Sequence, residues 1–336
     1  LTIIATPGGN YDGCIIKQWQ IAVRDISIRG HTDTVIYNGQ EQVVSGFDVS
    51  NLVNGHVVSG LTHVASGTLA VTHEGVFSGD LKVEVGGVDV TSNYNVIETV
   101  KGSLAILQKD ISDAIVELSG TLTYNGHNQT MGIDSVKVDG LTVTQYNVAG
   151  NTAKDAGTYT MVISGNQNFT GQKNIVWSIE KKDITVRTDG GTHTYDGTAF
   201  TKGGSIIGFV DSENSYRLET LGTITDVGSV TNGYRLTWVT ANSNNYVISE
   251  DLGTLVVVPR DIAGEIVDLG TTHTYDGNAK VQGIDSVIVD GLEVTYRVSG
   301  HVQVNAGTHQ MTILGTGNFT GSVQNDWQIS KRALDP

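Results

Sequence analysis

The sequence predicts an all-β chain built from small antiparallel sandwiches in tandem. Three observations lead to this prediction. Apolar and polar residues alternate with period two in several segments, such as 81–90, 141–148 and 159–165. The chain is rich in residues that form tight turns. One residue pattern also recurs along the chain, which is typical of a packing problem solved repeatedly. No stretch of 11 residues shows convincing helical periodicity.

Composition supports a folded chain and excludes some functions. The 336 residues include 42 Gly and 3 Pro, with 38% apolar and 16% charged residues, a balance that differs from that of disordered chains. The net charge is −15, and no basic face is visible, so we expect no nucleic-acid partner. The acidity favours solubility and self-repulsion on a crowded surface.

Cysteine chemistry and membrane insertion find little support. The single cysteine, Cys14, cannot form an internal disulfide, and no Cys/His spacing suggests zinc. No apolar run approaches the ~18 residues that cross a membrane, and no signal peptide is visible at Leu1. We therefore expect any targeting or anchoring part to lie outside this sequence.

The recurring pattern is an Asn and an aromatic residue before a Gly, with a Trp six positions after that Gly. It occurs in residues 9–24, 167–182 and 317–332. We predict that the aromatic faces inward, the Gly makes the turn and the Trp returns inward on the next strand. Burying each aromatic contributes at most ~4–6 kcal/mol. The positions are Tyr11, Gly13, Trp19; Phe169, Gly171, Trp177; Phe319, Gly321, Trp327.

A second motif is the triplet Tyr-(Asn/Asp)-Gly. Asn-Gly and Asp-Gly predict type I′ hairpins, in which both residues take positive φ. We expect the Tyr ring at the core edge and its hydroxyl on a backbone partner. An aromatic platform for sugar is the functional alternative. The Tyr and Gly positions are Tyr37, Gly39; Tyr124, Gly126; Tyr195, Gly197; Tyr275, Gly277.

Two kinds of repeat alternate, and a basic residue followed by Asp-Ile opens each one. We predict two long repeats, 25–109 and 183–260, and two short repeats, 110–182 and 261–332. Residues 1–24 match the second half of a short repeat, and 333–336 open a further one. No Pro/Ser-rich linker intervenes, so we expect short, stiff junctions. The simplest interpretation is a window of a longer array.

These motifs, in this order, resemble the bacterial immunoglobulin-like modules called MBG or YDG domains. The resemblance covers essentially the whole chain. It implies tandem immunoglobulin-like β-sandwiches of large secreted or surface proteins, often adhesins. It brings no catalytic residues and fixes no ligand.

Reactive centres are hard to place. The nine histidines are scattered, and no Gly-x-Ser-x-Gly, Walker or Rossmann pattern occurs, although counting residues cannot exclude a Ser/His/Asp triad. We expect no cofactor and no enzyme activity. Calcium bound at the repeat boundaries is a weak alternative. The simpler interpretation is that each boundary Asp starts a strand and pairs with the preceding Lys or Arg. The boundary carboxylates are Asp25, Asp110, Asp183 and Asp261.

Two covalent modifications are conceivable. A Lys–Asn isopeptide crosslink would need a core carboxylate that the sequence does not locate. Asn-x-Ser/Thr sequons begin at Asn128, Asn168 and Asn318, which for a bacterial chain is coincidence.

The leading functional hypothesis is a non-catalytic stalk or fibre segment of an extracellular surface protein. At ~10 residues per strand and ~3.3 Å per residue, each repeat would add ~35 Å. Expected partners are neighbouring repeats or copies of the chain. Alternatives are a glycan- or host-protein-binding array, an accessory region of a secreted enzyme, or a self-assembling filament subunit. The long internal loop from residue 51 is the candidate binding loop, through Asn51, Asn54, His56 and His63.

Overall fold

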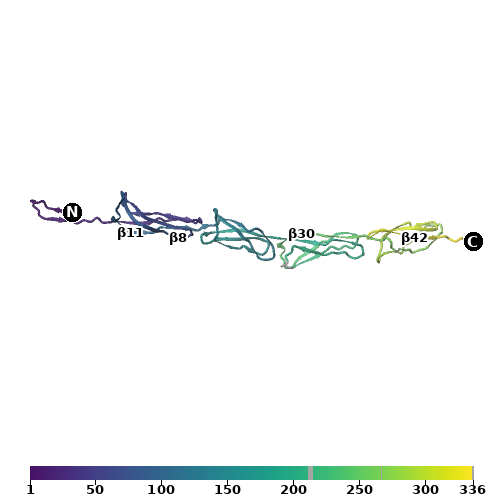
Figure 1. Ribbon diagram of the computed structural model, residues 1–336. Helices are drawn as coiled ribbons and strands as arrows, with labels where there is room; N and C mark the ends of the chain where they lie inside the picture. The colour runs from purple at the N-terminus through teal and green to yellow at the C-terminus, as the bar shows by residue number, and fades with distance from the viewer. Residues whose placement is uncertain (211–214, 266, 335–336) are drawn as a thin grey trace. The chain divides into compact units, whose positions relative to one another are not determined.

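The computed structural model describes residues 1–210, 215–265 and 267–334 of an all-β protein of tandem immunoglobulin-like sandwiches (Figure 1). Of the four residues expected to open a further repeat, only Ala333 and Leu334 are described; Asp335 and Pro336 lie outside the described residues. No helix among the described residues is long and apolar enough to span a membrane.

The chain falls into two compact units. The first comprises residues 1–120, 130–153 and 158–177, and the second comprises 121–129, 154–157 and 178–336. The first short repeat therefore contributes residues to both units, and each unit is considered by itself below.

The strands and short helical turns follow the repeats. The N-terminal segment holds β1 (Thr2–Ile4) and β2 (Cys14–Ile16). The first long repeat holds β3 (Arg24–Gly30), β4 (Asp33–Ile36), β5 (Gln42–Ser45), β6 (Phe47–Ser50), β7 (Val57–Gly67), β8 (Thr72–Glu74), β9 (Val76–Val85), β10 (Val88–Asp89), η1 (Thr91–Asn93), β11 (Tyr94–Val100) and β12 (Ser103–Leu107). The first short repeat holds β13 (Lys109–Asp110), β14 (Ile115–Leu118), β15 (Leu122–Thr123), β16 (Gln129–Thr130), β17 (Ile133–Val138), β18 (Leu141–Thr142), β19 (Tyr146–Ala149), β20 (Thr152–Ala153), β21 (Gly157–Gly165), β22 (Phe169–Thr170) and β23 (Gln172–Glu180).

The second half of the chain repeats this arrangement. The second long repeat holds β24 (Lys182–Thr188), β25 (Gly191–Thr194), β26 (Gly204–Ile207), β27 (Tyr216–Thr220), β28 (Gly228–Thr231), β29 (Tyr234–Trp238), η3 (Ser243–Asn245), β30 (Tyr246–Asp251) and β31 (Thr254–Val258). The second short repeat holds β32 (Arg260–Asp261), β33 (Val267–Asp268), β34 (His273–Thr274), β35 (Lys280–Val281), β36 (Ser286–Val289), β37 (Leu292–Glu293), β38 (Tyr296–Ser299), β39 (Val302–Gln303), β40 (Gly307–Gly315), β41 (Phe319–Thr320) and β42 (Ser322–Ser330).

The second long repeat shows how the alternating pattern becomes a core. β24 pairs antiparallel with β26 and parallel with β30, while β31 pairs parallel with β25 and antiparallel with β28. Ile184 and Val186 on β24 and Leu255 and Val257 on β31 are buried, because alternate side chains of a strand share one face. The sheets thus mix parallel with antiparallel pairs, and the parallel pairs were not expected from the sequence.

The second short repeat illustrates its type. Its two larger sheets have the strand orders β33-β36-β37 and β34-β42-β40-β38, and β32-β41 and β35-β39 form two-stranded sheets. One buried cluster contains Ile262, Ile313 and Phe319, and a second contains Met311 and Trp327. The Ile of the boundary pattern Asp-Ile therefore enters the core, with Ile262 fully buried. In the first short repeat, Phe169 and Trp177 are likewise 1% and 3% exposed.

The first long repeat differs from the second in a long hairpin. Residues 57–67, much of which the sequence suggested as loop, form β7, which pairs antiparallel with both β5 and β9. His63 on this strand is buried, and its Nε2 accepts a hydrogen bond from the Gly102 N–H at 3.1 Å. A Cβ at Gly30 or Gly75 would collide with the His63 ring, so these glycines make room for it.

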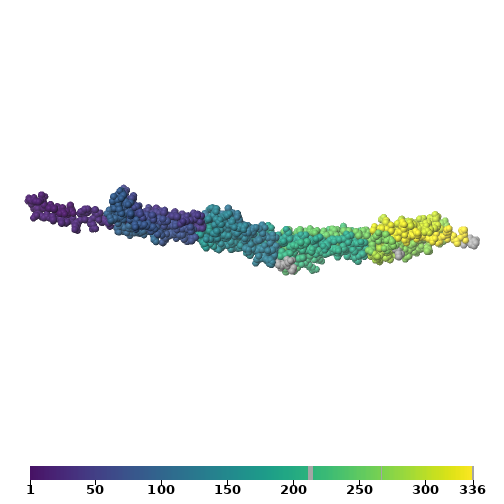
Figure 2. Space-filling view, in the orientation of Figure 1, coloured from purple at the N-terminus to yellow at the C-terminus, as the bar shows by residue number. Residues whose placement is uncertain are grey.

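The N-terminal segment corrects one prediction. β1 and β2 form an antiparallel hairpin in the N-terminal segment, which is purple in Figure 2. Tyr11 is 86% and Trp19 is 72% exposed. The expectation that both rings face inward is wrong for this copy. Gly13 makes the turn with φ 109° as expected. The physical reason is that no second sheet covers this hairpin among the described residues, whereas Trp327 has one.

Candidate functional site

The boundary between the first long and first short repeats, within the first unit, joins two motifs. The Tyr37 ring meets the Phe169 ring edge to face, with centroids 5.4 Å apart and an interplanar angle of 79°. The Asn168 side-chain oxygen accepts a hydrogen bond from the Ala70 N–H at 2.8 Å. The Lys109 N–H donates to the Asn168 carbonyl at 2.9 Å. The short repeat thus contacts the preceding long repeat through a ring pair and hydrogen bonds.

The next boundary, within the second unit, has the same geometry. The Tyr124 and Tyr246 rings meet edge to face with centroids 5.5 Å apart and an angle of 81°. The side chain of Asn245, which is fully buried, accepts from the Ala156 N–H at 2.8 Å and donates to the Asp155 carboxylate at 2.9 Å. Here a long repeat makes the same contacts with the short repeat that precedes it.

The third boundary, also within the second unit, repeats the arrangement. Tyr195 and Phe319 meet edge to face at 5.5 Å and 81°. The Asn318 side chain accepts from the Val227 N–H at 2.8 Å and donates to the Asp226 carboxylate at 2.9 Å. The Arg260 N–H donates to the Asn318 carbonyl at 3.0 Å.

We call this arrangement the junction clamp. Its donor is a Tyr-(Asn/Asp)-Gly turn together with a loop N–H of one repeat, and its receiver is the Asn–aromatic pair of the next repeat. An edge-to-face aromatic pair contributes about 0.5–1.5 kcal/mol beyond burial, and each buried hydrogen bond adds about 1 kcal/mol. The sequence showed both motifs but assigned each to its own repeat. Each boundary has one Tyr-(Asn/Asp)-Gly motif before it and one Asn–aromatic motif after it, and this regular count was the signal that could have linked the two motifs.

The donor turns are not the type I′ hairpins that the sequence predicted. The four glycines take positive φ, between 77° and 85°, but the preceding Asn or Asp does not. Instead, its side-chain oxygen accepts the backbone N–H two residues later, which forms an Asx turn. These pairs are Asn38 with Gln40, Asn125 with His127, Asp196 with Thr198, and Asp276 with Asn278, at 2.9–3.0 Å.

One donor turn has a strongly perturbed carboxyl group. The Thr198 hydroxyl and backbone N–H both donate to Asp196, and His193 lies 3.0 Å from its other oxygen. The hydrogen bonds from Thr198, with a smaller contribution from His193, lower the pKa of Asp196 to about 2. The carboxylate therefore stays ionised and keeps the turn closed at any ordinary pH.

The boundary carboxylates are engaged in local contacts. Asp110 and Asp261 each accept a backbone N–H two residues on, from Ser112 and Ala263, both at 2.9 Å. A Cβ at Gly171 or Gly321 would collide with these carboxylates, and both glycines have φ near 80°. The motif glycine is thus required by both its backbone angle and its neighbour.

The remaining two boundary carboxylates lie on first strands. Asp25 accepts from the Asn95 side chain at 2.9 Å, and Asp183 lies on β24 opposite Val247. Within residues 1–210, 215–265 and 267–334, no group of three or more His, Cys, Asp or Glu side chains could hold a metal ion.

Two of the boundary cations, Lys109 and Arg260, pair with a carboxylate other than the adjacent Asp, which corrects the simpler interpretation of the sequence there. Lys109 pairs with Asp139 at 2.6 Å, and Arg260 pairs with Asp290 in the same way. Both carboxylates sit at φ 48° in an Asp-Gly turn of the repeat that the cation opens. This turn reaches back toward the boundary strand, which sequence spacing alone does not reveal.

The candidate binding loop is held by its own side chains. Asn51, at φ 63°, donates from its amide to the Asp25 carbonyl at 2.6 Å and accepts from Arg24 at 2.9 Å. His56 Nδ1 lies 2.7 Å from the Tyr94 hydroxyl, and His63 is buried as described above. Asn54 is exposed at the loop tip.

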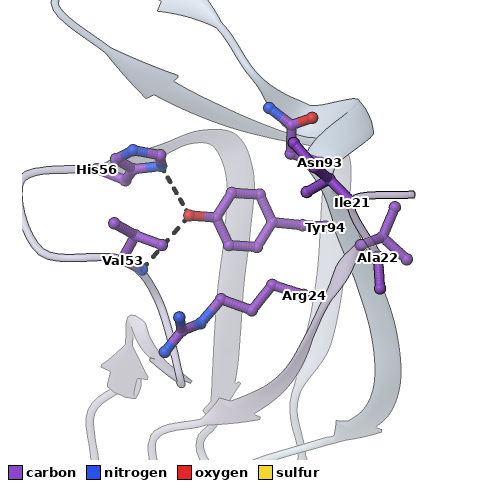
Figure 3. A pocket seen from close by; sticks show the side chains of 8 residues that line it. Ile21, Ala22, Arg24, Val53, His56, Asn93 and Tyr94 are labelled. Carbon is purple, nitrogen blue, oxygen red and sulfur yellow. Dashed lines mark hydrogen bonds between the residues drawn. The ribbon is translucent and has the colours of Figure 1, made fainter. Parts of the chain in front are cut away.

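A pocket of about 450 Å³ opens beside this loop (Figure 3). One wall is the extended stretch Ile21–Arg24, and the other is Val53 and His56. Asn93 and Tyr94 line it too, and the Tyr94 hydroxyl also contacts the Val53 N–H at 3.4 Å. All of these residues belong to the first unit.

Comparisons with known proteins return solved structures of low similarity. The four immunoglobulin domains 1–4 of Sidekick-1 match with 11% identity and a TM-score of 0.26, over 90% of this chain and 97% of that one. The Escherichia coli adhesin FdeC matches with 10% identity and a TM-score of 0.23, over 94% and 99%. The eight N-terminal immunoglobulin domains of Down syndrome cell adhesion molecule match with 12% identity and a TM-score of 0.17, over 92% and 55%.

No family model matches the sequence, and the search of curated proteins returns no match.

Proposed function

We propose that the chain is a non-catalytic spacer of an extracellular bacterial surface protein, an adhesin-like array that holds other domains away from the cell. The observation that carries the proposal is the junction clamp, which recurs with nearly constant geometry at three successive boundaries. A ring pair and a side-chain hydrogen bond at each of these three boundaries restrain bending between neighbours. An array that spaces domains needs this restraint at each joint.

The acidic composition supports the same role. A net charge of −15 keeps neighbouring molecules apart on a crowded surface. The Asn and aromatic groups of the clamp are engaged in contacts between repeats. On this proposal the working property of the chain is mechanical, and the expected partners are its own neighbouring repeats.

Small-angle X-ray scattering tests the proposal. The chain should give a narrow distribution of maximum dimensions that corresponds to ~35 Å for each repeat. A variant with Tyr37→Ala, Tyr124→Ala and Tyr195→Ala should retain its β-sheet circular dichroism and give a broad, shorter distribution. The matched control is Tyr275→Ala, which alters the same motif where no receiver follows among the described residues. A broad distribution for the unaltered chain would refute the spacer role.

A further inference from the structure

The imidazole of His63 lies inside the first long repeat. It projects from β7, is 1% exposed, and packs against the Phe77 ring with centroids 4.6 Å apart. Gly30 and Gly75 leave the space that the ring occupies, because a Cβ at either position would collide with it. A histidine that is buried this fully is confined to the hydrogen bonds that its immediate neighbours supply.

One hydrogen bond fixes the position of the proton on this ring. The Gly102 N–H, in the turn between β11 and β12, donates to His63 Nε2 at 3.1 Å. Because a backbone N–H can only donate, Nε2 carries no proton, and the neutral ring holds its proton on Nδ1. Nδ1 is buried and has no hydrogen-bond partner among the residues that the structure describes. The ring therefore ties β7 to the turn at Gly102 through Nε2 alone.

A second proton does not fit this site. Protonated His63 would carry an N–H at Nε2 that faces the Gly102 N–H, so the hydrogen bond between them would be lost. The positive charge would also be buried without an acceptor at either ring nitrogen, which disfavours the closed state strongly. The ring can therefore take up a second proton only after it has left its place.

The second long repeat fills the same space from different strands. Thr188 ends β24 just as Gly30 ends β3. Asn232 corresponds to Gly75, because each donates its N–H to the carbonyl of the glycine directly before the last strand of its repeat. Thr188 and Asn232 are both buried. Their side chains thus supply the bulk that the imidazole supplies in the first long repeat.

The side chains of Thr188 and Asn232 also complete the hydrogen bonds there. The Gly253 N–H donates to the hydroxyl oxygen and to the carbonyl of Thr188, both at 3.0 Å. The Thr188 hydroxyl donates to the Asn232 carbonyl at 2.6 Å. The Asn232 amide accepts from the Gly222 N–H at 3.1 Å and donates to backbone carbonyls. Neither side chain titrates, so acid leaves these contacts intact.

The other histidines of the first long repeat tolerate a second proton. His31 has an acceptor at each ring nitrogen, the Asp48 carboxylate at 3.4 Å and a backbone carbonyl at 3.0 Å. His73 has a backbone carbonyl 3.0 Å from Nε2. His56 Nδ1 lies 2.7 Å from the Tyr94 hydroxyl, whose oxygen can accept. Within this repeat, acid therefore opposes the contacts of the buried imidazole alone.

Charged groups on the strands around the buried ring have other partners or are exposed. Lys101 and Glu74 pair with each other at 3.8 Å, and Glu84 on β9 accepts from a serine hydroxyl at 3.1 Å. The two nitrogens of the ring meet only the Gly102 N–H among the described residues, so no carboxylate stabilises a charge there. The remaining charged residues of β3, β9 and β11 are exposed, namely Arg24, Asp25, Arg29, Asp80, Lys82 and Glu98.

We propose that His63 makes the first long repeat acid-sensitive: proton uptake releases β7 and β9 from the turn at Gly102, whereas the second long repeat stays closed. The sign follows from the contacts, because the closed form excludes the proton that the open form accepts. An imidazole in water takes up this proton near pH ~6.5. The closed form is therefore fully favoured above that pH, and its equilibrium with the open form shifts by up to about tenfold for each pH unit below it.

Hydrogen exchange of the unaltered chain, read by mass spectrometry between pH ~7.5 and ~5, tests the proposal across the titration range of histidine. Protection factors, corrected for the intrinsic pH dependence of exchange, are compared between peptides of β7 and β9 and peptides of β28 and β31. We expect protection in β7 and β9 to fall by up to about tenfold per pH unit below pH ~6.5. Protection in β28 and β31 should stay constant. An equal pH dependence in the two long repeats would overturn the proposal.

A first variant assigns the effect to the imidazole. His63→Gln keeps an oxygen that can accept the Gly102 N–H but cannot gain a proton in this range, so the fall in protection should disappear. The matched control is His31→Gln, which removes an exposed imidazole from the same repeat and should leave the fall in place. Loss of the pH dependence in the control variant would assign it to His31 and overturn the proposal.

A second variant keeps the test decisive if His63→Gln does not fold. Thr220 corresponds to His63, because each lies opposite the aromatic residue that follows Asn232 or Gly75 by two positions. The combination His63→Thr, Gly30→Thr and Gly75→Asn therefore transfers the contacts of the second long repeat into the first. Its protection should be independent of pH, and a persisting fall would overturn the proposal. None of these readouts depends on the spacer role.

Discussion

The ring of Tyr124 meets the ring of Tyr246 edge to face, with centroids 5.5 Å apart, across the boundary between a short and a long repeat. Tyr124 is 1% exposed and Tyr246 is 4% exposed, so the pair is a small core that belongs to two repeats at once. Folding of one repeat therefore stabilises the folded state of its neighbour. If one of the two repeats unfolds, the ring of the other becomes exposed and loses its partner ring.

Truncation of this ring should be costly. We expect Tyr124→Ala to lower the free energy of unfolding by about 3 kcal/mol or more, since a buried aromatic is replaced by a cavity. Tyr275→Ala is the matched control, because Tyr275 is 39% exposed and the change there should stay within about 1 kcal/mol. Urea denaturation followed by circular dichroism compares the two. Equal losses would contradict the junction clamp.

The buried Asn of the clamp should matter as much as the ring. Asn245→Ala leaves the Ala156 N–H and the Asp155 carboxylate without this partner, and we expect a loss of about 1–3 kcal/mol. Hydrogen exchange at the Ala156 amide should accelerate in the same variant. Asn93→Ala alters the exposed Asn that precedes Tyr94 in the first long repeat, and it should change neither the free energy of unfolding nor hydrogen exchange at the Ala156 amide. Retained protection at Ala156 would show that the hydrogen bond is dispensable.

Glycine at the motif turn should be required for two separable reasons. Gly171→Ala meets both a φ of 81° and the Asp110 carboxylate, whereas Gly277→Ala meets only a φ of 85° with open space around it. We expect about 1–2 kcal/mol for the φ effect alone and a larger loss at Gly171. Asp110→Ala in the Gly171→Ala background should recover the part of the loss at Gly171 that exceeds the loss at Gly277. A double-mutant cycle by thermal denaturation measures this coupling.

Tyr234 should ionise late. Its hydroxyl donates to Glu250 at 2.6 Å, and this hydrogen bond, with burial and the negative charge as lesser causes, raises the pKa of Tyr234 to about 12. Because the folded-state pKa exceeds the unfolded value of 10.0, the contribution to stability is complete below pH 10 and disappears as the pH rises through about 12. The ultraviolet phenolate titration, read as the difference from Tyr234→Phe, checks the value. Glu250→Gln should move the midpoint back toward 10.

Calcium should leave the melting temperature unchanged. Asp110 and Asp261 already accept backbone N–H groups, and calcium needs six to eight oxygen ligands. Calorimetry with added Ca²⁺ and again with a chelator provides the measurement. A rise in melting temperature that the chelator reverses would locate a metal site that the described side chains do not form.

The fold was accessible from the sequence because its signals are local. Period-two alternation in residues 159–165 leads directly to buried Met161 and Ile163. The type I′ expectation failed because the Asn or Asp side chain, rather than a second positive φ, closes each donor turn. Side-chain competition for backbone N–H groups is invisible in a dipeptide pattern.

The clamp lay beyond the sequence for a different reason. Tyr37 and Phe169 are 132 positions apart in the sequence. Their contact depends on where the sheets of two neighbouring repeats end relative to each other. The same applies to Lys109, whose partner Asp139 sits in a turn at φ 48° that no spacing rule places beside it. Trp19 is exposed because, among the described residues, no second sheet packs on the hairpin of residues 1–24.

Because long and short repeats present the same donor and accept it with the same Asn–aromatic receiver, the clamp forms alike from a long to a short repeat and from a short to a long one. Phe169, Tyr246 and Phe319 take their partner rings at nearly the same separation. Unequal crossing-over in the gene that adds or removes a long repeat together with a short one would therefore create boundaries of the kind already present. The length of such a polypeptide can drift over generations while each joint remains intact.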